Sequence, residues 1–141
     1  LHDALPIWMG DLAWKDKTGR IWFCGRKNHR VVTKYGTLYT IPCEAVFNNH
    51  PLVYRSALVG AGSPPDQTPV IIVEPEKSFQ EKDGSKLLRE LLALAAENTL
   101  TENIFTVLFK KDLPVDIRHN SKIFREKLAV WASGKVAEKT E

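Results

Sequence analysis

The spacing of hydrophobic and polar residues in the first third of the chain predicts two β-hairpins followed by a short helix. Apolar and β-branched residues gather in four runs, at residues 12–14, 20–24, 31–34 and 37–41. A turn-rich segment that ends at Gly19 separates the first two runs, and Tyr35-Gly36 separates the last two. Pro42 then begins a short helix, because a helix start has no use for the N–H that proline lacks, and His50-Pro51 ends it.

The remainder of the chain alternates between strand-like and helix-like patterns. Residues 54–59 and 70–74 are β-rich and predict neighbouring strands of one sheet. From Ser85 to Asn98 leucines recur at helical spacing, with Leu91 near the centre, so this segment predicts an amphipathic helix that packs into the core. A strand, a polar connection, a closing helix and a frayed end are predicted at residues 104–109, 110–120, 123–131 and 135–141.

These elements predict an α+β fold with a small mixed sheet, hairpins and flanking helices. A length of 141 residues leaves room for one domain with a substantial core, and not for two large ones. With 26% charged and 43% hydrophobic residues, the composition is that of a folded cytoplasmic domain. No apolar run in the sequence is long enough to cross a membrane.

Charge and cysteine content exclude several function classes. The net charge of +3 is too small to predict nucleic-acid binding, although residues 26–30 hold four basic side chains. Cys24 and Cys43 have neither metal-ligand nor redox spacing and lie beside apolar residues, so buried free thiols are expected. No pair of His, Asp, Glu or Cys has the spacing of metal ligands, so no metal site is predicted within this sequence.

Two segments contain candidate functional residues. Asp116–Leu128, with the sequence DIRHNSKIFREKL, places Lys122 in a polar turn directly before an amphipathic helix. Far upstream, residues 19–36 read GRIWFCGRKNHRVVTKYG. Its pattern predicts the strand at residues 20–24, a link at Asn28, and a second strand followed by a glycine turn.

The two segments resemble, in the same order, the C-terminal lysine motif and the hinge motif of the acyl-adenylate-forming (AMP-dependent) ligase superfamily. The run Ser121–Arg125 is similar to the Gly-Lys-Ile-x-Arg of that motif, with serine in place of glycine. Further segments with counterparts in the superfamily are Gly10-Asp11, Ile41–Glu44, Asn49–Val53 and Ala57–Gly60. The resemblance extends roughly over residues 8–132.

The resemblance implies a role for each of four residues. Lys122 would bring its ammonium to the reacting carboxylate and α-phosphate, where negative charge builds up. Asp11 would hold the ribose hydroxyls, and Arg26 would bind ribose or phosphate oxygens. Gly25, which has no side chain, would leave room for the nucleotide to approach Arg26. Asn28 would be the hinge. Each role has an ordinary alternative. Lys122 could be a solvated surface lysine and Asp11 a turn-forming aspartate. Arg26 could form a surface ion pair, and Asn28 could be an ordinary loop residue.

Arg118 and His119 precede the lysine and have two interpretations. As lid residues they would contact a substrate hydroxyl or phosphate. As structural residues they would form hydrogen bonds that fix the turn, and we favour this second interpretation. His29 and His50 are likewise expected to be structural.

Within the superfamily, the runs RKNHRV, GTLYTIPCEAVFNNHPLV and VDIRHNSKIFREKLAVWA look most like the olefin β-lactone synthetases of bacterial long-chain hydrocarbon biosynthesis. This resemblance implies that ATP is used to adenylate a 2-alkyl-3-hydroxy fatty acid, whose own hydroxyl displaces AMP to close a β-lactone without CoA. It implies as partners the N-terminal adenylation domain of the same enzyme, the fatty or β-hydroxy acid substrate, and other enzymes of the olefin pathway.

Length and motif content together predict the C-terminal lid of such an enzyme and not the whole catalyst. The superfamily's glycine-rich phosphate loop does not occur in this sequence, so ATP and Mg²⁺ would be held mainly by an N-terminal domain. Residues 1–7 match nothing in the superfamily and are left unassigned, as a foreign or truncated start. Residues 8–27 are expected to end the N-terminal domain, residues 28–132 to form the lid and residues 133–141 a frayed tail.

Two other functions stay open at this point. The chain could be the lid of an ordinary acyl-CoA or aryl-CoA synthetase, which would form a thioester. It could also be an interaction module that uses the lid fold without contributing to catalysis.

Overall fold

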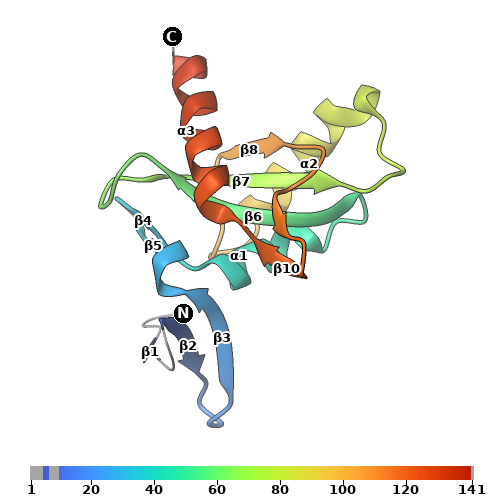
Figure 1. Cartoon of the computed structure of the whole chain (residues 1–141). Coiled ribbons are helices and arrows are strands. Elements are labelled where there is room, and N and C mark those ends of the chain that lie inside the picture. Colours follow the sequence, from blue (N-terminus) through green and yellow to red (C-terminus); the bar gives the residue numbers. More distant parts are fainter. Residues whose placement is uncertain (1–4, 7–9, 141) are drawn as a thin grey trace.

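The computed structural model describes residues 5–6 and 10–140, apart from the side chains of residues 5, 119–121 and 140. Within these residues the strands form four small sheets, which are accompanied by three α-helices and two 3-10 turns (Figure 1). Among the helices described, none combines the length and the apolar character that a bilayer span requires.

The N-terminal part is an antiparallel sheet of three strands, β1 (Leu5–Pro6), β2 (Asp11–Lys15) and β3 (Ile21–Arg26). The first predicted hairpin is thus confirmed. In its turn, the Asp16 carboxylate accepts hydrogen bonds from the backbone N–H groups of Thr18 and Arg20 and from the indole N–H of Trp22. These bonds favour the charged carboxylate, the Trp22 bond most, so the pKa of Asp16 lies well below its usual range.

A 3-10 turn, η1 (Lys27–His29), leads from this sheet to the rest of the chain. It is followed by the second predicted hairpin, β4 (Val31–Thr33) and β5 (Gly36–Leu38), and by helix α1 (Thr40–Asn48). Helix α1 begins two residues before Pro42, the predicted start. The proline is tolerated at this third position because the first four N–H groups of a helix have no carbonyl partner within it.

The main sheet has the strand order β6-β7-β8, with β6 (Val53–Ala61), β7 (Thr68–Pro75) and β8 (Thr106–Phe109). Strands β6 and β7 are antiparallel neighbours, as predicted, whereas β8 is parallel to β7. A parallel pair needs a crossover connection. The 3-10 turn η2 (Glu81–Asp83) and helix α2 (Gly84–Ala96) provide it, and α2 matches the predicted amphipathic helix.

The C-terminal part consists of a short hairpin, β9 (Val115–Asp116) and β10 (His119–Ile123), followed by helix α3 (Arg125–Thr140). Three predictions are corrected here. The polar connection at residues 110–120 contains β9 and the start of β10, Ile123 ends a strand instead of starting the helix, and α3 continues beyond Trp131 through the end that was expected to fray. Ile123 is buried and Val136, in the second half of α3, packs against the same core cluster, which accounts for the longer helix.

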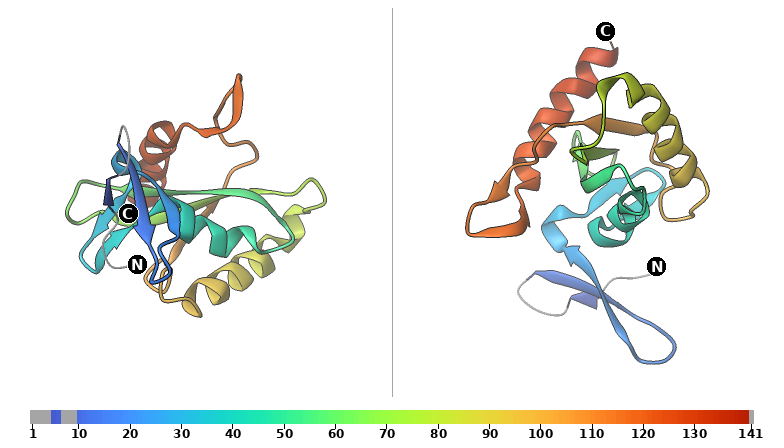
Figure 2. Two further views of the ribbon diagram at one scale, coloured as in Figure 1. Left: turned by 90° about the horizontal axis from the view of Figure 1, so that it is seen from below. Right: turned by 90° about the vertical axis from the view of Figure 1, so that its right-hand side faces the viewer.

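The main sheet lies between two helical layers, with α1 and α2 on one face and α3 on the other (Figures 1 and 2). On β7, Ile71 and Val73 pack towards α1 and α2, whereas Val70 and Ile72 pack towards α3, because side chains alternate along a strand. Leu91 of α2 is fully buried in the first cluster, as its position in the leucine stripe predicted.

Candidate functional site

The two predicted nucleotide-binding residues meet at the open end of the first hairpin. Asp11 of β2 and Arg26 of β3 are directly opposite in the strand register, and Nη1 of Arg26 donates to Oδ1 of Asp11 at 2.8 Å. The Arg26 side chain is 51% exposed and the Asp11 side chain 28%. In such a pair the carboxylate can accept hydrogen bonds from hydroxyls, and the guanidinium can donate hydrogen bonds to phosphate oxygens. The contact is equally the surface ion pair named above as the ordinary alternative for Arg26.

The predicted hinge residue, Asn28, lies in the middle of η1 and is exposed. The flanking residues are both extended, with φ and ψ of −79° and 140° at Arg26 and of −61° and 147° at Arg30. The backbone therefore changes from extended to helical and back within five residues. A hinge needs such a short segment to absorb a change of direction, and the hinge role stays a prediction.

Gly25 is required by packing between β3 and α1, which differs from the reason that the sequence suggested. Its φ of +124° favours glycine, and a Cβ at this position would lie 2.3 Å from Oγ1 of the buried Thr40. The space that a side chain would fill is therefore occupied by the first residue of α1, and not left open for a nucleotide.

Replacing Gly25 with alanine should destabilise the 141-residue chain by about 2 kcal/mol or more, since backbone strain and overpacking each cost about 1–3 kcal/mol. Urea unfolding measures this loss. Gly19→Ala is the matched control, because Gly19 also has a positive φ, +88°, but nothing lies within 4 Å of its added Cβ. Equal losses for the two variants would contradict the packing explanation.

Lys122, the predicted catalytic residue, lies on β10 and is exposed. The sequence placed it in a turn, but the turn of this hairpin is at Ile117 and Arg118, and Lys122 follows on the returning strand. Its ammonium has no side-chain hydrogen bond or ion pair to any residue whose side chain the structure describes. Figures 1 and 2 show the β9–β10 hairpin and η1 on the same side of the main sheet and its helices, the side that is nearer to β2 and β3.

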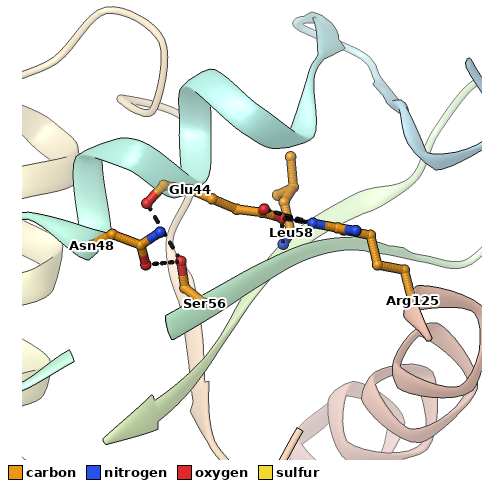
Figure 3. Close-up of polar contacts among 5 residues, drawn as sticks. All are labelled: Glu44, Asn48, Ser56, Leu58 and Arg125. Atoms are coloured by element: carbon orange, nitrogen blue, oxygen red, sulfur yellow. Dashed lines mark hydrogen bonds and ion pairs between the residues drawn. The ribbon is translucent and has the colours of Figure 1, made fainter. Parts of the chain in front are cut away.

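The segment just after Lys122 is fixed by a buried ion pair between α3 and α1 (Figure 3). Nη2 of Arg125 donates to both carboxylate oxygens of Glu44, at 2.7 and 3.0 Å, and its Nε donates at 3.3 Å. The same carboxylate accepts the backbone N–H of Leu58 on β6 at 2.8 Å. Ser56 adds a contact, since its hydroxyl donates to Oδ1 of Asn48 at 2.8 Å and lies 3.4 Å from the Glu44 carbonyl oxygen.

Glu44 is 5% exposed, and this burial raises the pKa of its carboxyl, while Arg125 and the Leu58 N–H act in the opposite direction. The negative charge of Glu44 therefore depends on Arg125. Both residues lie within motifs of the sequence, Ile41–Glu44 and Ser121–Arg125, but neither motif predicts a contact between them. Their occurrence in two separate motifs of one superfamily is the one signal that could have suggested it.

His50 and the two cysteines have structural surroundings. His50 accepts the Leu52 N–H at Nδ1, and its Nε2 lies 2.7 Å from Oε2 of Glu90, so it links the segment that follows α1 to α2. Cys24 and Cys43 are buried free thiols, as expected. Burial raises the pKa of Cys43 to about 12, which excludes a reactive thiolate there at neutral pH.

The structure describes the surroundings of the Arg118 side chain but not those of the His119 side chain. The Arg118 backbone N–H donates to Oδ1 of Asp116 at 2.9 Å, while its side chain is 87% exposed. This bond fits the turn-fixing interpretation of Arg118, although its role stays a prediction. The side chain of His119 lies outside the described residues. Among those described, no group of three or more His, Cys, Asp or Glu side chains is arranged to hold a metal ion.

The sequence is similar to curated proteins named olefin beta-lactone synthetase. It is 48% identical to the one from Xanthomonas campestris pv. campestris over 125 residues, which are 89% of this chain and 22% of that protein. It is 47% identical to the one from Stenotrophomonas maltophilia over 131 residues, which are 93% of this chain and 23% of that protein. The chain thus spans less than a quarter of the length of these relatives. No protein-family profile matches it.

Solved structures of adenylating ligases have the same fold. The anthranilate CoA ligase AuaEII, in complex with anthranoyl-AMP, matches with a TM-score of 0.77 at 21% identity over 91% of this chain and 24% of its own. The amide bond synthetase McbA from Marinactinospora thermotolerans matches with a TM-score of 0.70 at 21% identity, over 86% and 24%. These matches confirm the predicted α+β lid fold. The chain is thus homologous by sequence to part of the olefin β-lactone synthetases, and its fold is that of a segment of AMP-forming ligases.

Proposed function

We propose that this chain acts as the C-terminal lid of an ATP-dependent ligase that adenylates a 2-alkyl-3-hydroxy acid and closes it to a β-lactone. The observation that carries this proposal is the identity of 47–48% to olefin β-lactone synthetases over 89–93% of the chain. In the first step a carboxylate oxygen attacks the α-phosphorus of ATP and pyrophosphate leaves. In the second, the 3-hydroxyl oxygen attacks the acyl carbon, loses its proton, and AMP leaves with the electrons of the broken acyl–phosphate bond.

In this proposal Lys122 serves the first step. Negative charge accumulates on the carboxylate and α-phosphate oxygens as they come together, and a nearby ammonium stabilises it. The exposure of Lys122 on β10 supports this role, because an exposed ammonium is accessible to an incoming anion. Beside η1, Asp11 would accept hydrogen bonds from the ribose hydroxyls and Arg26 would donate to ribose or phosphate oxygens.

The described residues fit ATP better than they fit a resident metal. Asp11 and Arg26 present one acceptor and one donor group side by side at 2.8 Å, which suits a nucleotide with hydroxyls and phosphates. Mg²⁺ would arrive with ATP and be held mainly by the larger domain of the enzyme. Three consecutive large apolar residues of β3, Ile21, Trp22 and Phe23, are 48–65% exposed. Such an exposed apolar surface supports contact between β3 and that larger domain.

An acyl-CoA synthetase lid is the second candidate, because the fold also matches CoA ligases such as AuaEII. The two candidates differ in product. To separate them, this chain would replace the matched segment of the Xanthomonas enzyme, and the chimera would receive ATP, Mg²⁺ and a 2-alkyl-3-hydroxy acid, with and without CoA. We expect AMP release and a product lighter than the acid by one water, formed equally well without CoA, as read by mass spectrometry.

A CoA thioester as the main product would instead support the acyl-CoA synthetase. The unmodified Xanthomonas enzyme serves as the positive control. If the chimera folds and forms neither product while this control is active, the non-catalytic interaction module becomes the better explanation.

A further inference from the structure

His29, the last residue of η1, contacts the first turn of α3. Its Nε2 lies 2.8 Å from Oε1 of Glu126, although the two residues are 97 positions apart in the sequence. The His29 side chain is 17% exposed and the Glu126 side chain 72%. The histidine therefore fills the junction between the two elements, and the glutamate closes it from the solvent side. Hydrogen bonds from its own backbone N–H and from His29 hold the pKa of Glu126 below its usual value, so the carboxylate is charged at neutral pH.

This contact lies directly beside the predicted hinge. Asn28 separates the contact from the Asp11–Arg26 pair, which holds the other end of η1 to β2. The N–H of Lys27 also donates to the carbonyl oxygen of Gly10 at 2.7 Å. One end of the turn is thus attached to the N-terminal sheet and the other end to α3, and a backbone change at Asn28 can occur between them.

The start of α3 is held firmly to the segment before β9 and to α1. The N–H of Phe124 donates to the carbonyl oxygen of Pro114 at 2.9 Å, and Arg125 forms the buried pair with Glu44. Ile123, which directly follows Lys122, is 8% exposed. Glu126 is therefore attached to the same rigid segment that carries Lys122, four positions earlier.

We propose that His29 and Glu126 are positioning residues that fix the lid side of the hinge to the segment carrying Lys122, an inference that rests on the function proposed above. With the contact in place, a rotation at Asn28 moves Lys122 as part of one rigid unit. Without it, His29 and the following residues can flex, and the ammonium reaches the reacting oxygens in many orientations. A partly exposed polar contact of this kind contributes little to folding stability, so its main effect is on orientation.

His29→Ala and Glu126→Ala in the chimera should each lower the adenylation rate roughly tenfold, because a small misplacement of a reacting group can cost up to about 10²-fold. We expect the loss in kcat, with little change in KM for ATP, and no further loss in the double variant. His29→Gln keeps an N–H donor of similar reach and should recover most of the rate. Glu138→Ala is the matched control, since Glu138 is 70% exposed and pairs with Lys135 on the same helix at 3.4 Å.

The decisive measurement repeats His29→Ala and Glu126→Ala in a Lys122→Ala background. If the two residues act through Lys122, neither substitution should lower the residual rate further. An additional tenfold loss in that background, or an equal loss in Glu138→Ala, would overturn the positioning role. Normal rates for both single variants, with Lys122→Ala impaired, would also overturn it and leave the proposed function intact. A normal rate for Lys122→Ala itself would instead refute the catalytic role on which the inference depends. Thermal unfolding of the 141-residue chain identifies any variant that fails to fold.

Discussion

Substituting alanine for Lys122 should reduce adenylation by the chimera by about 10²-fold or more, the usual effect of removing one electrostatic stabiliser of a transition state. The side chain is exposed, on a strand whose next residue is buried, so the substitution removes a charge without opening a cavity. Pyrophosphate release with saturating ATP and acid measures the adenylation step. The unfolding midpoint should stay close to that of the unsubstituted protein.

Two comparisons make the Lys122 result specific. Lys111→Ala removes another exposed lysine and should leave the rate unchanged. Lys122→Arg keeps the charge but replaces a compact ammonium by a planar fork, so we expect partial recovery at most. An adenylation rate within twofold of the unsubstituted chimera for Lys122→Ala would refute the role, and the interaction module would then regain weight.

The elements that follow one simple period could be predicted from the sequence. The leucine stripe of α2 repeats at helical spacing, and Leu91 is fully buried as expected. Strands β6 and β7 consist largely of β-branched and small apolar residues, and both faces of β7 are buried. In these segments local pattern and tertiary burial agree, which is why the pattern was informative.

The β9–β10 hairpin was missed because its residues show neither the alternation typical of a strand nor the apolar spacing typical of a helix. The run DIRHNSK is polar apart from Ile117, and that isoleucine is 98% exposed at the turn. Pairing of β9 with β10 depends on backbone hydrogen bonds and on the burial of Ile123, which a polar pattern does not reveal. The position of Lys122 on a strand therefore followed from tertiary structure.

The candidate site was also predictable only in part: the resemblance indicated its residues, but not the contacts between them. Asp11 and Arg26 were proposed separately from the resemblance. The register that joins them depends on the turn around Asp16 and also on an irregularity between Leu12 and Ala13 that shifts the strand pairing by one residue. The contact between Glu44 and Arg125 spans 81 positions, and no local pattern connects a residue of α1 to one of α3 over that distance. Such a pair is set by how the two helices pack against β6 from opposite faces of the main sheet, which one sequence does not specify.

Glu44→Ala should cause one of the largest losses of stability available in this chain, about 3–5 kcal/mol, as expected when one partner of a buried ion pair is removed. The substitution leaves the Arg125 guanidinium, whose side chain is 14% exposed, without its carboxylate. It also leaves the N–H of the fully buried Leu58 without its acceptor. Urea unfolding of the 141-residue chain measures the loss. Glu44→Gln keeps one acceptor oxygen and should lose less, so an equal loss for the two variants would contradict this explanation.

Arg125→Met should cost less than Glu44→Ala, because the stranded group is then a carboxyl, which can take up a proton, whereas a guanidinium cannot lose one. Burial already raises the pKa of Glu44, and removing Arg125 takes away the charge that opposes this shift. A carboxyl whose pKa is raised in the folded state carries no penalty below its ordinary pKa of 4.5, and the penalty grows as the pH rises above that value. The stability difference between the unsubstituted chain and Arg125→Met should therefore be small near pH 4.5 and larger at pH 8. A difference that increases as the pH falls would mean that Glu44 is not held in the buried, charged state that the ion pair implies.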